Sequence, residues 1–157
     1  MANCVVIREI TSQNPVDYRF ALMNQDIQNG CVVKLGDLVE GHRDVYAAAT
    51  PAATDELWLA VGVELMYEER KAITDYINKA NIPFRVERVK AGGTYAISVD
   101  GLTASAEIAA GNVVVATAAN KLTVKASSAS GDTVVGKVIE VYTRAGIKFA
   151  AIQFVKD

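Results

Sequence analysis

Short apolar runs, separated by residues that favour turns, make up most of this chain. Gly, Asn, Asp, Ser and Pro stand between the runs, as they do between the strands of all-β proteins. The expected strands span residues 31–35, 45–50, 57–65, 84–89, 95–99, 103–108, 113–116, 122–126, 133–142 and 147–155. Many short strands with dense turn signals predict a mainly β fold, a small antiparallel barrel or sandwich.

Two of these regions carry more specific signals. Apolar and charged residues alternate over 84–89, and Gly92-Gly93 separates this run from the strand expected at 95–99. This pattern predicts a β-hairpin with one face exposed to solvent. In the final strand, 147–155, the apolar positions shift phase along the run, which predicts either a β-bulge or a strand that turns a barrel corner.

One stretch of the chain has helical rather than strand periodicity. Over residues 68–80 the apolar side chains recur at helical spacing and the charged side chains occupy the opposite face. Asn81 and Pro83 then provide a stop signal. The pattern predicts a single α-helix over about 68–80, inserted between the strands, with its apolar stripe packed against the core.

A weak internal repeat runs through the sequence. Gly30-Cys31-Val32-Val33, followed later by Val61-Gly62-Val63-Glu64 and Tyr67, has the same order as Gly111-Asn112-Val113-Val114, followed by Val135-Gly136 and Tyr142. We therefore expect 30–67 and 111–142 to form two related strand–loop–strand units. In this alignment Gly62 and Gly136 occupy equivalent positions.

The first 29 residues mix short apolar pieces with polar turns. We expect residues 1–29 to form an N-terminal arm that contacts a partner or a neighbouring copy, and 30–157 to form a single β-rich domain. The alternative is that the segment is an edge strand of the domain's own sheet. The apolar residues that would make the contacts are Val5, Val6, Ile7, Tyr18, Phe20 and Leu22.

Composition limits the classes of partner. The chain has 157 residues, of which 51% are hydrophobic, enough to bury the core of one domain. The 16 basic and 18 acidic residues give a net charge of −2, so no strong field of one sign favours nucleic acid or an anionic membrane. The longest apolar runs are far short of the ~20 residues that span a bilayer, and the N-terminus lacks the features of a signal peptide. We expect a protein partner, no nucleic-acid or membrane partner, and folding in the cytoplasm.

The residues that support chemistry are few. Cys4 and Cys31 are expected to be free thiols that pack as small apolar side chains. The only histidine, His42, cannot complete a four-ligand zinc site with two cysteines. Glu68 and Glu69 are neighbours, but no sequence feature places them on either side of a substrate bond. Neither glycine-rich nucleotide-binding motif occurs. We expect no catalytic residue, no metal site and no cofactor, and hence no enzyme activity.

The glycine–valine units resemble those of the head decoration proteins of tailed bacteriophages, the small proteins that stabilise or cement a capsid. The resemblance rests on Asn29-Gly30-Cys31-Val32-Val33-Lys34-Leu35-Gly36, on the later VGVE, and on their counterparts from Gly111 to Glu140, within the range 30–155. It implies a structural virion protein on the capsid exterior, bound to the major capsid protein. It also implies a homo-oligomer, with a trimer possible. The partner of the expected arm would then be the capsid or a neighbouring subunit.

Two other classes of function fit the same composition. One is a different virion component, such as a head-fibre base or a tail protein. The other is a small-molecule-binding or enzymatic β-barrel, which would be favoured by a deep pocket lined with convergent polar groups around His42 or the Glu68-Glu69 pair.

Overall fold

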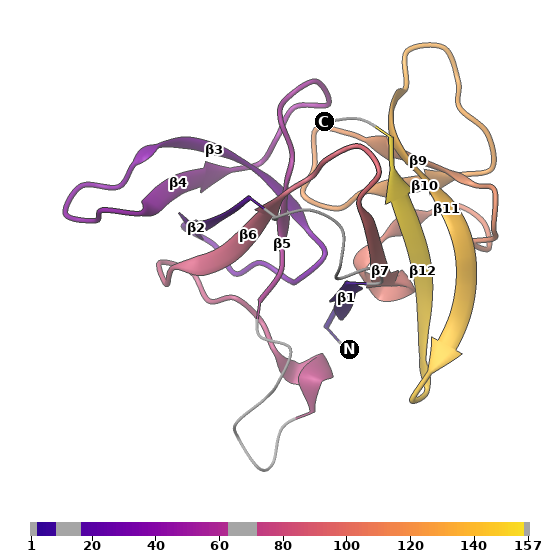
Figure 1. Ribbon diagram of the computed structural model, residues 1–157, viewed down its shortest axis with the longest axis horizontal. Coiled ribbons are helices and arrows are strands. Elements are labelled where there is room, and N and C mark those ends of the chain that lie inside the picture. Colours follow the sequence, from indigo (N-terminus) through magenta and orange to yellow (C-terminus); the bar gives the residue numbers. More distant parts are fainter. Residues whose placement is uncertain (1–2, 9–16, 63–71, 156–157) are drawn as a thin grey trace.

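The computed structural model describes residues 3–8, 17–62 and 72–155, and these residues form β-strands, turns and two short 3₁₀ segments (Figure 1). The strands make a closed five-stranded barrel and a seven-stranded sheet. The predicted mainly β class is therefore confirmed, and one of its two parts is a small barrel.

The barrel is formed by the N-terminal half of the chain, with the strand order β2-β4-β3-β5-β6. Neighbouring strands are antiparallel except β2 and β4, which are parallel, and the pairing of β2 with β6 closes the barrel. Buried apolar side chains, among them Val33, Trp58 and Val86, fill its interior. The strands are β2 (Tyr18–Leu22), β3 (Val32–Leu38), β4 (Val45–Ala49), β5 (Trp58–Ala60) and β6 (Phe84–Arg88).

The seven-stranded sheet has the order β1-β7-β12-β11-β9-β10-β8, and only β8 and β10 are parallel. It shares a second apolar core with the barrel, a cluster of buried residues that includes Leu59 from β5 and Ile97, Val114 and Phe154 from strands of the sheet. The two halves are therefore joined by a common core. The strands are β1 (Val6–Arg8), β7 (Thr94–Ser98), β8 (Thr103–Ala104), β9 (Val113–Ala116), β10 (Thr123–Lys125), β11 (Thr133–Arg144) and β12 (Ile147–Phe154).

The two halves have the same strand connectivity. In the barrel, β2 pairs antiparallel with the last strand, β6, and parallel with β4. In the sheet, two strands together correspond to β2. β7 pairs antiparallel with the last strand, β12, and β8 pairs parallel with β10. A 3₁₀ turn, η2 (Val99–Gly101), separates β7 from β8. The remaining strands keep the orders β4-β3-β5 and β10-β9-β11. Over the residues that the structure describes, the repeat thus extends well beyond the two predicted units: it covers about residues 17–62 and 72–89 in the first half and 93–155 in the second.

Backbone hydrogen bonds align the two halves residue by residue. The N–H of Gly30 donates to the carbonyl of Ala60 at 2.9 Å, and the N–H of Gly111 donates to the carbonyl of Val138 at 2.8 Å. Both glycines have a positive φ, +79° and +91°, which a side chain would disfavour. Gly30 and Gly111 therefore occupy equivalent positions, as the sequence alignment predicted, and so do Ala60 and Val138.

The predicted equivalence of Gly62 and Gly136 is wrong. Gly136 pairs with Phe154 in β11, where Trp58 pairs with Arg88 in β5, so its counterpart is Trp58. Gly62 lies beyond the end of β5. The two glycines avoid different clashes: a Cβ on Gly136 would stand 3.0 Å from the carbonyl oxygen of Gln153, whereas one on Gly62 would meet other side chains. The Val-Gly dipeptide therefore occurs in both halves, but a different close contact requires the glycine in each half.

The predicted helix over 68–80 is not found in the part of this stretch that the structure describes, 72–80; residues 68–71 lie outside it. One 3₁₀ turn, η1 (Ile73–Asp75), is followed by an isolated bridge between Asn78 and Ile27. The Asn78 amide donates to the carbonyl of Ile27 and to the side chain of Asn29. These tertiary hydrogen bonds hold the segment extended, so they override the helical periodicity of its side chains.

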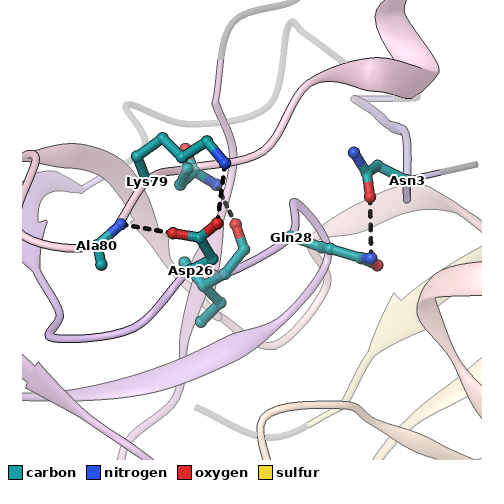
Figure 2. Close-up of polar contacts among 7 residues, drawn as sticks. Asn3, Asp26, Gln28, Lys79 and Ala80 are labelled. Atoms are coloured by element: carbon teal, nitrogen blue, oxygen red, sulfur yellow. Dashed lines mark hydrogen bonds and ion pairs between the residues drawn. The ribbon is translucent and has the colours of Figure 1, made fainter.

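A cluster of polar contacts fastens this segment to residues 26–29 (Figure 2). Asp26 accepts hydrogen bonds from the backbone N–H of Ala80 and from Lys79 Nζ, both at 2.9 Å. These donors hold the pKa of the Asp26 carboxyl below its usual value. Gln28 Nε2 donates to Asn3 Oδ1 at 3.0 Å, as Figure 2 also shows. The N-terminal strand and the connection that leads into β6 are thus tied to the same turn.

The predicted hairpin over 84–99 is also wrong, because β6 and β7 belong to different sheets. Residues 90–93 form the expected turn, but it carries the chain from one half to the other. There the N–H of Gly92 donates to the carbonyl of Phe154, and the N–H of Phe154 donates to the carbonyl of Gly93. A turn signal predicts a change of direction but does not identify the strand that pairs next.

The bulge predicted for the final strand lies in its neighbour. The register between β11 and β12 shifts between Val138 and Glu140, opposite Ile152 and Ala151. The apolar positions of β12 shift phase because its partner strand, β11, contains one extra residue, Ile139, at this point.

The N-terminal residues lie within the two sheets. β1 is an edge strand that pairs antiparallel with β7, and Cys4, Val5 and Val6 are buried. β2 is an integral strand of the barrel. β1 therefore matches the edge-strand alternative, whereas β2 is an internal strand of the closed barrel. Neither of these two strands leaves the domain as an arm.

Candidate interaction surface

Among the described residues, those considered for chemistry, His42, Cys4 and Cys31, do not form a common site. His42 is exposed in the loop between β3 and β4. Cys4 and Cys31 are buried free thiols; burial raises the pKa of Cys4 to about 12 and also raises that of Cys31. Glu68 and Glu69 lie outside the described residues. Within the described ranges no group of three potential metal ligands occurs.

The outer face of β2 carries exposed aromatic side chains. Strand alternation places Tyr18 and Phe20 on one side of β2 and Ala21 on the other, in the barrel core. Tyr18 is 54% exposed and Phe20 is 37% exposed. Their rings meet edge to face, with centroids 6.4 Å apart. Two large aromatic side chains are thus held next to each other in solvent.

Arg85 of β6 completes this surface. It lies opposite Phe20 in the β2–β6 ladder, and its guanidinium carbon is 5.2 Å from the centroid of the Tyr18 ring, a cation–π contact. Arg85 Nη2 also pairs with the buried carboxylate of Glu87 at 2.7 Å, and Glu87 accepts a hydrogen bond from the hydroxyl of Tyr95 at 2.9 Å. We call Tyr18, Phe20 and Arg85 the β2–β6 surface.

The structure separates the six predicted contact residues into two groups. Tyr18 and Phe20 form part of the β2–β6 surface, and Leu22 is half-buried at the end of β2. Val5 and Val6 are buried beside β7, and the side chain of Ile7 lies outside the described part of the chain. Arg85 was not among the predicted residues. Its alternation with Phe84 indicated an outward side chain, but the pairing of β6 with β2 could not be read from the sequence.

A hollow lies at one end of the barrel, close to the opposite face of β2. Its volume is about 310 Å³, and a charged residue of each sign and two aromatic residues line it. The lining residues are Arg19, Leu35, Gly36, Tyr46, Glu56 and Trp58. Arg19 lies over the Tyr46 ring, 6.0 Å from its centroid, and Glu56 pairs with Arg88 of β6 at 3.2 Å. Both charged side chains of the hollow are therefore engaged with protein groups.

Comparison of the sequence with models of known protein families found no match, and comparison with curated proteins found no relative. In the described part of the chain, no helix has the length and apolar character needed to cross a bilayer. The interpretation of function therefore rests on the residues and their geometry.

Proposed function

We propose that the protein is a structural, non-enzymatic virion component that binds the outer surface of a phage capsid and stabilises or decorates it. The observation that supports this proposal is the β2–β6 surface. Tyrosine, phenylalanine and arginine are enriched in protein–protein interfaces. The two aromatic side chains bury a large area with few rotatable bonds, and arginine adds a planar group with several hydrogen-bond donors. Here Tyr18 and Phe20 are exposed to solvent although they are large and apolar.

The packing behind this surface suits recognition of a rigid partner. Arg85 is fixed by the buried carboxylate of Glu87, and the Tyr18 ring lies against Arg85. Side chains that are already positioned lose less conformational entropy when they bind. A shell displays many identical sites, so an oligomer of this protein would gain avidity from modest individual contacts.

In this proposal the partner is the major capsid protein, and the protein acts on the capsid exterior without a cofactor. The contact residues are Tyr18 and Phe20, with Leu22 at their margin. Val5 and Val6 serve the core of the fold, since they are buried beside β7.

Purification of the tagged protein from the cells that produce it tests the proposal. We expect a major capsid protein to co-purify, and we expect images of shells with and without the protein to differ by density on the outer surface. Co-purification with tail or fibre proteins, with no density on the shell, would instead favour the other virion components.

The hollow at the end of the barrel favours a second candidate, binding of a small molecule. Its volume of about 310 Å³ is at the lower end of the range for ligand pockets, roughly 300–1,000 Å³. His42 is not among the residues that line the hollow, although it is one of the residues around which, from the sequence, a pocket of this kind would form. Ligand screening by thermal shift, with Trp58→Phe as the comparison variant, tests this candidate: a stabilising ligand whose effect weakens in the variant would support it.

A further inference from the structure

In the part of the chain that the structure describes, the outer edge of β11 has no paired strand over its second half. β9 pairs with β11 only from Thr133 to Lys137, and the last contact on that edge is the pair of hydrogen bonds of Val138 with Gly111 and Asn112. Figure 1 shows β11 at the margin of the sheet, with β12 on its inner side. Within the described residues, no strand pairs with the outer edge of β11 from residue 139 to residue 144.

The register with β12 identifies the backbone groups that this edge presents. The two strands are joined by Ala145 and Gly146, both with positive φ, so Arg144 and Ile147 close a two-residue hairpin. In such a hairpin Arg144, Tyr142 and Glu140 direct their N–H and C=O groups toward β12. Val141 and Thr143 direct theirs to the open edge.

Residues on this edge favour pairing with another strand. Val141, Tyr142 and Thr143 have high β propensity, and β11 carries no proline that would prevent an added strand from pairing. Glu140 and Arg144 are exposed, and neither forms an ion pair within the described residues. They lie four residues apart on the same strand face, with Tyr142 midway between them.

These features make the edge complementary to itself, and we propose that two copies of the chain associate through antiparallel pairing of their β11 strands about a two-fold axis at Tyr142. In this register Val141 lies opposite Thr143 of the second copy, so the backbone groups that face outward meet each other. Glu140 lies opposite Arg144 of the second copy, and the symmetry repeats both pairs.

The same register places the charges where they attract most. Glu140 and Arg144 form pairs that are not hydrogen-bonded through the backbone, in which cross-strand side chains approach most closely. Moving the axis by one residue would place Val141 opposite residue 145 or residue 141, and would remove the Glu140–Arg144 pairing. Charge therefore selects a single register. The interface is narrow, so the dimer is expected to be weak and its formation to depend on concentration.

Sedimentation velocity over a range of concentrations tests this proposal with a charge swap. We expect the full chain to show a monomer–dimer equilibrium. Glu140→Arg alone and Arg144→Glu alone should each weaken dimerisation on the order of ten- to a hundredfold, because both cross-strand pairs become repulsive. The double variant Glu140→Arg/Arg144→Glu should restore dimers, and so should a mixture of the two single variants.

Arg43→Glu is the matched control, because Arg43 is an exposed arginine in the loop between β3 and β4. It makes the same change of charge away from β11 and should leave dimerisation unaltered. Circular dichroism verifies that each variant is folded. A chain that remains monomeric, a trimer, or a dimer that persists in both single variants would overturn the proposal. It does not depend on capsid binding, so it can fail or hold independently of the proposed function.

Discussion

Asp55 and Asp132 close the same turn in the two halves of the chain. The backbone N–H of Ala52 donates to Asp55 Oδ2 at 2.7 Å, and that of Ala129 donates to Asp132 Oδ2 at 2.8 Å. In each turn the aspartate N–H donates back to the alanine carbonyl at 3.1 Å. Side-chain and backbone bonds thus fix the direction of the chain as it enters β5 and β11.

The aspartates of these turns predict that the free energy of unfolding depends on pH. The backbone donor of Ala52 and then Lys34 lower the pKa of Asp55, and Lys125 and then the backbone donor of Ala129 lower that of Asp132. The folded-state pKa values lie below the unfolded value of about 3.9, so the unfolded state takes up protons first as the pH falls. The stabilisation is complete at neutral pH and is lost as the pH falls below about 4. Urea unfolding between pH 7 and pH 3 measures this loss, which should be smaller in Asp55→Asn/Asp132→Asn. An unchanged loss in the double variant would contradict the assignment.

Glu87 provides a test of the contacts beneath the β2–β6 surface. It is fully buried, whereas its counterpart in the second half, Gln153, is exposed. Glu87→Ala removes the acceptor of Arg85 and Tyr95 and should lower the free energy of unfolding by about 1–3 kcal/mol. Gln153→Ala is the matched control and should change it by less than about 0.5 kcal/mol. Equal effects of the two substitutions in chemical denaturation would show that the buried contacts do not contribute.

Gly62→Ala tests the packing of the segment that precedes β6. An added Cβ would stand 2.5 Å from the Tyr76 ring and 2.7 Å from Asn29 Oδ1, so these groups must move. We expect a loss of about 1–3 kcal/mol in the free energy of unfolding. Gly36→Ala is the control, because its Cβ would meet only the carbonyl of Ala47 at 3.6 Å. A Gly62→Ala protein as stable as Gly36→Ala would contradict the close approach.

Deletion of residues 2–8 distinguishes a strand from an arm. The deletion removes β1 and three buried side chains, those of Cys4, Val5 and Val6. At roughly 1–2 kcal/mol for each, the loss is about 3–6 kcal/mol, a large part of the stability of a domain of this size. We expect a lower midpoint of thermal unfolding and a tendency to aggregate. A truncated protein that unfolds at the same temperature as the full chain would show that the segment is dispensable, as an arm would be.

Local sequence signals were sufficient to predict strands in the regions of β3 to β12 and several turns, but they did not identify β1 and β2, which lie in the segment expected to form an arm. The runs at 113–116 and 147–155 became β9 and β12 almost unchanged, because alternation and flanking turn residues specify a strand by themselves. The turn glycines Gly30 and Gly111 were also recognised, since a positive φ leaves a strong preference for glycine.

Features that depend on distant partners could not be predicted in this way. The helical periodicity before Ala80 was overridden by the hydrogen bonds of Asn78 with residues 27 and 29. The exposure of Tyr18 follows from the pairing of β2 with β6, which are far apart in the sequence. The full extent of the repeat was hidden because Trp58 and Gly136 share a position but no chemical property.

Co-sedimentation with capsid shells tests the role of the β2–β6 surface most directly. Tyr18→Ser removes an exposed ring from this surface, and Leu38→Ser removes an exposed apolar side chain of similar exposure, 50% against 54%, from β3. Circular dichroism verifies that both variants are folded. We expect the wild-type protein and Leu38→Ser to sediment with the shells at equal occupancy, and Tyr18→Ser to bind at least tenfold more weakly, as the loss of an interface hot spot would produce. Full occupancy by a folded Tyr18→Ser protein, or no sedimentation of the wild-type protein with the shells, would contradict the account.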